Sequence, residues 1–394
     1  MQCQTGDLST PLFDGARALI PLLRSNGDRI NEGRSLPADI FGRMADEGLL
    51  SLMRPKRFGG KELGSDVVLR VAAILAEGDG SAAWVYGILG SHDHLIGLYG
   101  EEVQKRYWNS PRPHCASSYI PTGRARQADG GYVLSGNWSF CSGIDHCDWI
   151  ALGALVPDVD GANAPDLFIF LLRTAQIQIV DDWNVMGLAG TGSKSVVVND
   201  VFVPLDHALN NRHVQSGNTP GRESQTNPLY RTSIWPLFGF SILAPAVGIA
   251  KGAYELTTSE VKARLASPDR LFEGRKPATL LRLAEAGAHI DAAHLLYERG
   301  LAETHHRIMN EQPLSNELRG RNRRDQAFIA KLCRQALESL MGLTGGRGIR
   351  EGNPVQRALR DLYAISAHPA SSWDSAALSF GSVATGGPLT EPFC

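Results

Sequence analysis

The sequence lacks a surplus of charge of either sign. Its 39 lysine and arginine residues nearly balance its 41 aspartate and glutamate residues, leaving a formal net charge of −2 at pH 7. Such a chain has no general attraction for nucleic acid or anionic membranes. It also lacks an apolar run approaching the ~20 residues of a membrane span. Its N-terminus lacks the basic and apolar segments of a secretory signal. These absences predict a cytoplasmic protein with no nucleic-acid partner and no membrane partner.

Metal and disulfide sites are poorly represented as well. The six cysteines, at positions 3, 115, 141, 147, 333 and 394, form no CxxC pair, which argues against structural zinc and fits a reducing compartment. His92 and His94 are two residues apart, so their side chains would point about 200° apart on a helix. His289 and His294 lack the ExxH spacing of di-iron bundles. We therefore expect no metal.

Three common catalytic signatures are missing. The stretch GLAGTG at 187–192 does not match GxGxxG, and it precedes an apolar strand where a dinucleotide fingerprint would follow one. Neither a GxxxxGK[ST] loop nor a GxSxG nucleophile elbow occurs. The sequence therefore predicts no NAD(P)H or ATP site of its own and no serine-type nucleophilic catalysis.

What the chain does contain is a clear succession of patterns. Apolar residues at three- and four-residue spacing predict helices in residues 1–115. Short β-rich runs then predict a compact β domain, a small barrel or sandwich, which together with a polar linker at 207–228 forms a middle domain of residues 116–228. Helical periodicity resumes in 229–394, with segments near 238–267, 277–311, 314–343 and 353–367. Segregated helices and strands indicate an α+β fold.

Two short segments combine flat apolar side chains with hydrogen-bond donors. SGNWSFCSGIDHCDW at 135–149 places Trp138 and Trp149 beside Ser142 and Gly143, and GLAGTGS at 187–193 precedes the last long strand. A planar heterocycle such as isoalloxazine needs a flat wall and donors along its polar edge. In the alternative interpretation, the tryptophans are core residues and the glycines form turns. Residue types alone leave both interpretations open.

Six stretches, in their order and spacing, carry a family resemblance. They are PKRFGG (55–60), DGSAAWVYGILGSH (79–92), SSYIPTG (117–123), NWSFCSGIDHCDW (137–149), VMGLAGTGSKSVVVNDVFVP (185–204) and RDLYAISAH (360–368). Together they resemble the acyl-CoA dehydrogenase superfamily. Within it they are similar to the flavin-dependent aromatic hydroxylases, the oxygenase components of two-component monooxygenases. The resemblance spans nearly the whole chain. It implies N-terminal helices, a central β domain and a C-terminal four-helix bundle, usually in a homotetramer.

The resemblance, read with the motifs above, also implies residue roles. Catalysis is implied for Ser142 at flavin N5, for His92 at the substrate hydroxyl and for His368 in handling protons at the flavin. Cofactor binding is implied for Trp84, Ser118, Tyr119, Trp138, Cys141, Ser142, Gly143, Thr191, Ser193, Arg264, Gly346, Arg347 and His368. Substrate binding is implied for His92, Ser118, Arg231 and Trp373. By residue type alone, His92 and His368 would be incidental helix histidines.

The reaction that the resemblance implies uses reduced FMN or FAD and O2. A C4a-hydroperoxyflavin would hydroxylate an aromatic substrate, ortho to a phenolic hydroxyl. The reduced flavin would come from a separate NAD(P)H:flavin reductase, because no NAD(P)H site is predicted here. The alternatives are an N- or S-oxygenase on the same scaffold and a true acyl-CoA dehydrogenase. The latter uses a C-terminal catalytic glutamate, whereas this tail has none between Glu351 and Glu391.

Overall fold

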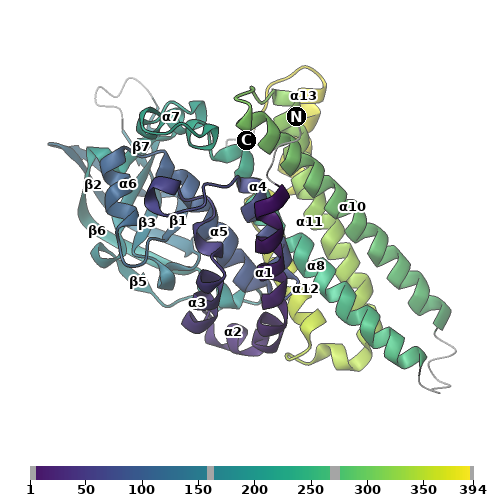
Figure 1. The fold of residues 1–394 in the computed structure, drawn as a ribbon. Helices are drawn as coiled ribbons and strands as arrows, with labels where there is room; N and C mark the ends of the chain where they lie inside the picture. The colour runs from purple at the N-terminus through teal and green to yellow at the C-terminus, as the bar shows by residue number, and fades with distance from the viewer. Residues whose placement is uncertain (1–5, 158–163, 267–275, 391–394) are drawn as a thin grey trace.

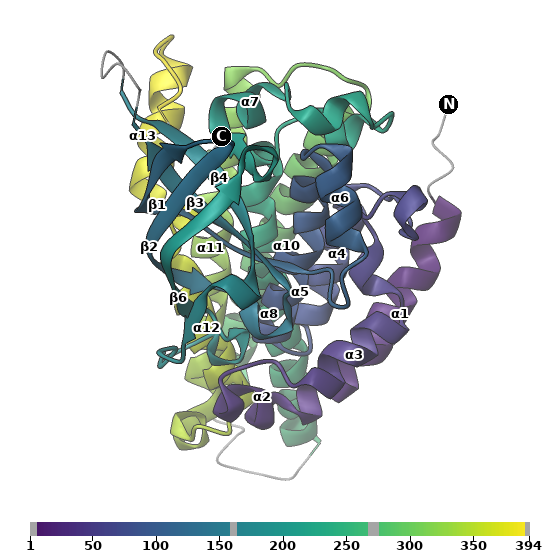
Figure 2. The same cartoon turned by 90° about the vertical axis from the view of Figure 1, so that its left-hand side faces the viewer.

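Helices come first in the folded chain, a β-sheet follows, and a helical bundle ends it (Figure 1). The computed structural model describes residues 6–157, 164–266 and 276–390. The sheet lies on one side of the molecule, the long helices of the bundle run along the other, and N-terminal helices lie between them, as the two views in Figures 1 and 2 show. The predicted α+β fold is confirmed.

The N-terminal helices are α1 (Gly6–Ser25), α2 (Gly27–Gly33), α3 (Ala38–Asp46), α4 (Ser65–Ala76), α5 (Gly80–Gly97) and α6 (Glu101–Trp108). Among them, α4 and α5 pack against each other and against α8 (Trp235–Leu265) of the bundle. Asp79 caps α5 by accepting a hydrogen bond from the backbone N–H of Ala82 at 2.9 Å. Every residue of α5 except Ser91 is buried. A helix that is apolar on all sides belongs in a core, and α5 therefore forms an inner wall between the sheet and the bundle.

The described strands form one open sheet of mixed direction. They are β1 (Cys115–Ala128), β2 (Gly131–Cys141), β3 (Trp149–Val156), β4 (Asp166–Arg173), β5 (Gln178–Val180), β6 (Lys194–Pro204) and β7 (Ala208–Asn210), in the order β5-β6-β2-β1-β3-β4-β7. β1 pairs in parallel with β3, and the other paired strands are antiparallel. The sequence predicted a barrel or sandwich. A parallel pair of strands that are not consecutive is invisible to residue alternation.

The C-terminal part is a bundle of long helices. They are α8 (Trp235–Leu265), α10 (Lys276–Met309), α11 (Asn316–Thr344), α12 (Pro354–Ser366) and α13 (Trp373–Ala384). α8, α10 and α11 pack side by side (Figure 1). Asn353 caps α12 by accepting from the backbone N–H groups of Val355 and Gln356, and Pro354 occupies the first helical position. The four predicted helical segments lie within a few residues of α8, α10, α11 and α12.

α8 is more apolar than the sequence analysis allowed for. By length and composition it is the one helix among the described residues that could cross a membrane. Most of that apolar stretch is buried inside the fold, against α4, α5, α10 and α11. A core helix that contacts neighbours on all sides has the same composition as a membrane span. Its apolar character is thus explained by packing within the protein.

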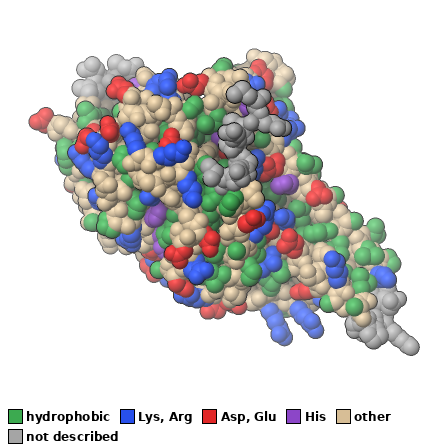
Figure 3. Space-filling model, viewed as in Figure 1, with side chains coloured by type: hydrophobic (Ala, Val, Ile, Leu, Met, Phe, Trp, Pro, Cys, Tyr) green, Lys and Arg blue, Asp and Glu red, His purple; other side chains and the backbone are tan. Residues whose placement is uncertain are grey.

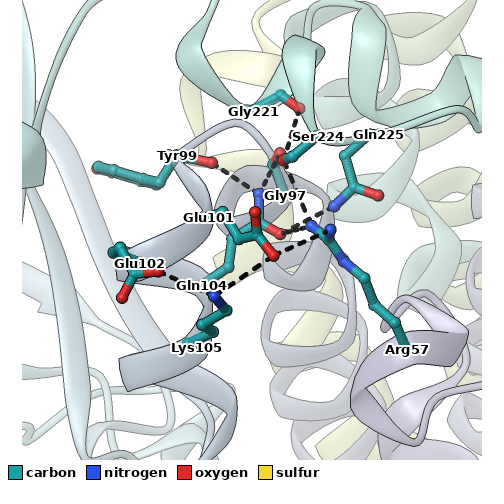
Figure 4. Close-up of polar contacts among 10 residues, drawn as sticks. All are labelled: Arg57, Gly97, Tyr99, Glu101, Glu102, Gln104, Lys105, Gly221, Ser224 and Gln225. Atoms are coloured by element: carbon teal, nitrogen blue, oxygen red, sulfur yellow. Dashed lines mark hydrogen bonds and ion pairs between the residues drawn. The ribbon is translucent and has the colours of Figure 1, made fainter.

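The polar segment predicted as a linker is tied to the first domain. It contains β7, α7 (Asn211–Ser216) and a short 3-10 turn. Gln104 of α6 is fully buried, and its amide donates to the carbonyls of Gly97 and Tyr99 at 3.0 and 2.6 Å. Its oxygen accepts hydrogen bonds from Arg57 at 2.7 Å and from Gln225 at 2.9 Å (Figure 4). These contacts hold the segment in place where it enters the bundle.

Charged side chains are mixed on the surface. On the face shown in Figure 3, basic and acidic groups are interspersed and neither sign forms a broad patch. This distribution agrees with the net charge of −2.

Candidate active site

A cavity of about 480 Å³ lies where the sheet, α5 and the bundle meet. Its wall is largely aromatic and aliphatic, with a few hydroxyl, amide, guanidinium and imidazole groups. No aspartate or glutamate side chain of the described residues lines it. The lining residues used below are Trp84, Ser117, Ser118, Tyr119, Phe140, Ser142, Trp183, Leu188, Thr191, Ser193, Trp235, Phe238, Gly239, Ile242, Arg323, Gln326, His368, Pro369 and Ala370. An apolar pocket of this size with a few convergent polar groups is typical of a small-molecule site.

A row of hydroxyl groups runs along one side of the cavity. Thr191 Oγ1 donates to the carbonyl of Leu188 at 2.8 Å. Because each hydroxyl carries one proton, Ser193 then donates to Thr191 and Ser142 donates to Ser193, both at 2.7 Å. Trp84 Nε1 donates to Ser142 Oγ at 3.0 Å. The direction of the row is therefore fixed, and Ser142 keeps a lone pair for a donor in the cavity.

The glycine-containing turn that carries Thr191 and Ser193 packs closely against two helices, α2 and α12. A Cβ on Gly187 would lie 2.1 Å from the carbonyl oxygen of Arg360 in α12, and a Cβ on Gly190 would lie 2.1 Å from the Ile30 side chain in α2. Only glycine permits such an approach. Next to Gly187, the backbone N–H of Leu188 donates to Asp361 Oδ1 at 2.6 Å. The glycines thus serve close packing of the backbone, and the hydroxyls of Thr191 and Ser193 face the cavity.

Asp361 is a buried carboxyl group with another carboxyl nearby. Burial, and next the charge of Asp79, raise the pKa of Asp361 to about 7. Burial also raises the pKa of Asp79. Arg357 and Arg360 oppose the shift of Asp361 without cancelling it. Asp361 therefore connects the turn at Leu188 to α12, and its buried environment favours the protonated carboxyl.

A second polar pair reaches the cavity from behind β1. His92 Nδ1 lies 2.5 Å from the carbonyl oxygen of Cys115, so Nδ1 carries the ring proton. Nε2 is then an acceptor, and Ser117 Oγ donates to it at 3.1 Å. Burial lowers the pKa of His92 to about 4, which keeps the ring neutral at neutral pH. His92 itself does not line the cavity, but Ser117 does.

His368 lies on the opposite, bundle side of the same cavity. The backbone N–H of Ala370 donates to its Nδ1 at 3.1 Å, which leaves the proton of the neutral ring on Nε2. Burial, and next the charge of Arg323, lower the pKa of His368 to about 4. Arg323 donates to the carbonyls of Pro369 and Ala370 and so holds this turn. The neutral ring is a hydrogen-bond donor at Nε2 and lacks a free lone pair.

Other expected residues of the first wall also line the cavity. Trp84, Ser118, Tyr119, Thr191 and Ser193 all do. Ser118 Oγ, however, donates to the carbonyl of Ser139 at 2.9 Å and forms no bond to His92. The hydroxyl beside His92 is that of Ser117, which the sequence analysis did not single out.

Trp138, expected as the flat wall, lies elsewhere. It is 1% exposed and does not line the cavity. Its Nε1 donates to the carbonyl of Gly153 at 2.7 Å, and its ring lies against Gly123, where a Cβ would come within 2.0 Å. The strand is irregular here: Phe140 has a φ of 67°, and the register of β2 on β6 shifts between Trp138 and Cys141, so Phe140 and Ser142 face the cavity while Trp138 does not. Cys141 is likewise buried outside the cavity wall.

Aromatic faces come instead from Trp84, Phe140 and Trp183. Phe140 and Trp183 meet edge to face, with ring centroids 5.9 Å apart. Gly143, another expected cofactor residue, adopts a φ of 69° and packs on Val85 and Leu89. Its N–H donates to the carbonyl of Thr191 at 2.9 Å, so it connects the two segments without facing the cavity.

Five further expected residues do not line the cavity of their own chain. Arg231 pairs with Glu311 at 3.5 Å, and Trp373 packs on Phe328 with ring centroids 5.6 Å apart. Arg264 donates to the carbonyl of Leu343 at 3.2 Å, near the turn that contains Gly346 and Arg347.

Helix geometry explains the distance of this last group. Ile242 is the last residue of α8 that lines the cavity, and Arg264 follows it by 22 positions. At ~1.5 Å per residue, the two lie roughly 33 Å apart along the helix. Figure 1 shows this end of α8 at the far end of the bundle from the sheet.

No metal centre is evident in the part of the chain that the structure describes: no group of three or more histidine, cysteine, aspartate or glutamate side chains there could hold a metal ion. Four cysteines in the described ranges are buried and free.

Comparisons with known proteins agree with this fold. Residues 22–111 match the acyl-CoA dehydrogenase N-terminal domain, and residues 240–373 match the acyl-CoA dehydrogenase C-terminal domain. The chain is 32% identical over 381 residues to the flavin-dependent monooxygenase oxygenase subunit HsaA of Rhodococcus jostii, covering 95% of this chain and 98% of that protein. It is 32% identical to the FADH(2)-dependent resorcinol hydroxylase oxygenase component of a Rhizobium species, covering 91% and 90% of the two chains.

A solved structure gives the same result. The crystal structure of 3-HSA hydroxylase from Rhodococcus sp. RHA1 superposes with a TM-score of 0.93 at 31% identity, covering 97% of this chain and 98% of that one. Fold, order of domains and sequence thus agree over nearly the full length. The chain belongs to the acyl-CoA dehydrogenase family, in its branch of flavin-dependent aromatic hydroxylases that act as oxygenase components.

Proposed function

We propose that this protein binds reduced flavin and a phenol in the 480 Å³ cavity and hydroxylates the aromatic ring ortho to its hydroxyl. The observation that carries the proposal is the presence, in one cavity, of the Ser142 hydroxyl row and the Ser117–His92 pair. When bound, reduced flavin supplies the two electrons with which O2 is split. One oxygen atom then enters the ring, and the other leaves as water.

The residues on the hydroxyl-row side fit a reduced flavin. Trp84, Phe140 and Trp183 offer flat apolar faces to a tricyclic ring. Ser142 Oγ accepts a hydrogen bond from Trp84 Nε1 and donates one to Ser193 Oγ. Its remaining lone pair can accept a hydrogen bond from a ligand in the cavity. The N5 atom of a reduced flavin is a donor, whereas that of an oxidised flavin is an acceptor. We therefore assign Ser142 to N5–H, with a preference for the reduced cofactor.

The Ser117–His92 pair suits the phenol. A phenol that donates to Ser117 Oγ is connected through that hydroxyl to the unprotonated Nε2 of His92. Removing the phenolic proton makes the ortho carbon of the ring more nucleophilic. Burial lowers the pKa of His92 to about 4, so the ring is neutral but weakly basic, and we assign it to accept the phenolic proton through Ser117 in concert with oxygen transfer.

His368 has a different task in this proposal. Its Nδ1 is occupied by the N–H of Ala370, so Nε2–H donates a hydrogen bond into the cavity. We assign this donor to the oxygen that develops negative charge during transfer. The apolar wall excludes water, which limits wasteful release of H2O2.

A separate reductase would supply the reduced flavin, as the two-component relatives imply. We also propose that the active form contains more than one copy, with a homotetramer as the expected assembly. The support is the roughly 33 Å between Arg264 and the cavity of its own chain, estimated from the helix rise. Arg264, Gly346 and Arg347 would then reach the flavin phosphate of a second copy. A cytoplasmic location fits an enzyme that receives its reduced flavin by diffusion.

The test supplies reduced FMN or FAD, ¹⁸O2 and a panel of phenols, and measures products by mass spectrometry. We expect one ¹⁸O atom per catechol formed. A fatty acyl-CoA that bleached bound oxidised flavin without oxygen would support a dehydrogenase and contradict the proposal. The cavity argues against that alternative, because no carboxylate of the described residues lines it.

A further inference from the structure

One polar side chain in the cavity wall has no use in the reaction proposed above. Gln326 of α11 is only 5% exposed, lines the cavity and forms no hydrogen bond among the described residues. Its amide lies against Gly239 of α8, where a Cβ would come within 2.0 Å of the amide oxygen. A buried amide without a partner costs roughly 1–3 kcal/mol unless a ligand satisfies it. The glycine opposite it provides the room in which this amide lies.

Gln326 stands at a distinct end of the cavity. Beyond it, a small crevice of about 20 Å³ continues between α8 and α11, and Trp235, Arg323 and Gln326 line both spaces. Two neighbouring groups of the lining are engaged: Trp235 Nε1 donates to Asn211 at 2.9 Å, and Arg323 donates to the carbonyls of Pro369 and Ala370. The Tyr119 hydroxyl in the cavity wall and Asn322 Oδ1 in the crevice are buried without a partner among the described residues. The amide of Gln326 lines both spaces and is left to meet a ligand.

We propose that Gln326 determines substrate specificity by hydrogen bonding to a neutral oxygen, a hydroxyl or ketone, on the part of the phenol that extends toward α11. The proposal rests on the proposed hydroxylase function and names the class of its substrate. That class is a phenol whose apolar body carries a second, uncharged polar group at a distance from the reacting ring.

The charge of the wall explains why this second group is neutral. Arg231, the arginine expected to bind the substrate, pairs with Glu311 outside the cavity. The one arginine of the described residues that lines the cavity, Arg323, holds the turn after His368 through two backbone carbonyls. A carboxylate placed here would lose its hydration; the charge of Arg323 would attract it, but its new hydrogen bond would come from the amide of Gln326, because Arg323 already donates to two backbone carbonyls. A hydroxyl or ketone needs no more than that amide.

The test measures binding of three ligands to the flavin-free protein by titration calorimetry. The ligands are para-propylphenol, the same molecule with a terminal hydroxyl, and the same molecule with a terminal carboxylate. We expect the hydroxyl ligand to bind about tenfold more tightly than para-propylphenol, and the carboxylate ligand to bind least tightly. In Gln326→Leu, we expect the affinity difference between the hydroxyl and propyl ligands to fall to about twofold or less.

Two further variants keep the test independent of folding. Gln335→Leu makes the same change nine positions along α11, outside the cavity, and should retain the tenfold preference. Gln326→Glu keeps the shape of the side chain and should weaken binding of the carboxylate ligand further. Equal binding of the hydroxyl and propyl ligands to the unaltered protein, or an undiminished preference in Gln326→Leu, would overturn the proposal.

Oxygenation of the three ligands, measured separately, reports on the reaction itself. If all three are hydroxylated and Gln326→Leu changes neither binding nor rate, the assignment of Gln326 is wrong and the hydroxylase function stands. If none is hydroxylated with reduced flavin and O2 while the binding difference is present, the hydroxylase function fails and the recognition by Gln326 stands.

Discussion

The Nε2 atom of His92 lies 3.1 Å from Ser117 Oγ, and the neighbouring Ser118 turns away to the carbonyl of Ser139. This relationship yields a matched pair of variants. We expect Ser117→Ala to lower product formation roughly 100-fold, because it breaks the connection between phenol and base. Ser118→Ala should change it little. Product formation per flavin oxidised is the measurement, and equal effects of the two variants would contradict the relay.

A second prediction concerns His368. Replacing it with alanine removes the Nε2–H donor that we assign to the oxygen under transfer. We expect flavin oxidation to continue at a similar rate while its yield of hydroxylated product falls, with H2O2 rising to match. Peroxide and product are measured in the same reaction. Unchanged coupling in His368→Ala would remove the role assigned to this imidazole.

The hydroxyl row predicts redox-dependent affinity. Ser142→Ala removes the acceptor for N5–H, so we expect the affinity for reduced flavin to fall roughly tenfold and that for oxidised flavin to change less. Ultrafiltration under nitrogen, with each form of the flavin, gives both constants. Ser139→Ala, a serine change three residues earlier in the chain and outside the cavity lining, serves as control. Equal losses for both redox forms would show that Ser142 does not distinguish them.

Asp361 predicts a pH-dependent stability. Its pKa of about 7 in the folded state exceeds the ordinary value of 3.8, so the folded protein binds this proton more tightly than the unfolded chain. The stabilisation is therefore full below about pH 4 and is lost as the pH rises through 7, by up to about 4 kcal/mol.

Asp361→Asn tests this prediction, because the amide oxygen can still accept from the N–H of Leu188 while the titration disappears. We expect the free energy of unfolding of the variant to fall less between pH 5 and pH 8 than that of the unaltered protein. Urea unfolding at several pH values measures both. Asp79, Arg357 and Arg360 face the same group, and they are kept in the variant. Parallel curves for the two proteins would exclude Asp361 as the source.

The last prediction addresses the second copy. Arg264→Ala should weaken reduced-flavin binding about tenfold, because a charge-assisted contact to phosphate is lost. Arg282→Ala is the control, since Arg282 donates to the neighbouring carbonyl of Gly342 at the same end of the bundle. Light scattering gives the mass of each protein. A monomer that binds flavin with full affinity would contradict a shared site.

Much of the fold could be predicted from the sequence because local signals were strong. Asn353 before Pro354, for example, marks a helix start, and the structure begins α12 at Pro354. β1 is harder to predict, because its sequence CASSYIPTGRARQA has no regular apolar alternation and its register shifts between Ser118 and Gly123. The order in which strands pair depends on segments that are far apart in the chain, so the residue pattern within one strand does not predict it.

The site was predicted in part for a similar reason. Ser142 and Ser193 were both expected at the cofactor because each lies in a short motif with glycine, and they are hydrogen-bonded neighbours in the cavity wall. Trp138 was assigned to that wall because tryptophan is flat, but the irregularity of β2 between Trp138 and Cys141 turns Phe140 to the cavity and leaves Trp138 in the core, and the sequence does not show that irregularity. Ser117 and Gln326 carried no local signal. Each becomes notable only when residues far along the chain, His92 and Gly239, are seen against it.

The backbone of Leu188 connects α12 to the hydroxyl row. The N–H of Leu188 donates to Asp361 of α12, and the C=O of Leu188 accepts from Thr191, the last hydroxyl of the row that begins at Ser142. A shift of α12 by a fraction of an ångström would therefore be transmitted, bond by bond, to Ser142. Substitutions on the outer face of α12 would retune the oxygen chemistry while touching neither ligand, so a search for altered coupling could profitably begin there.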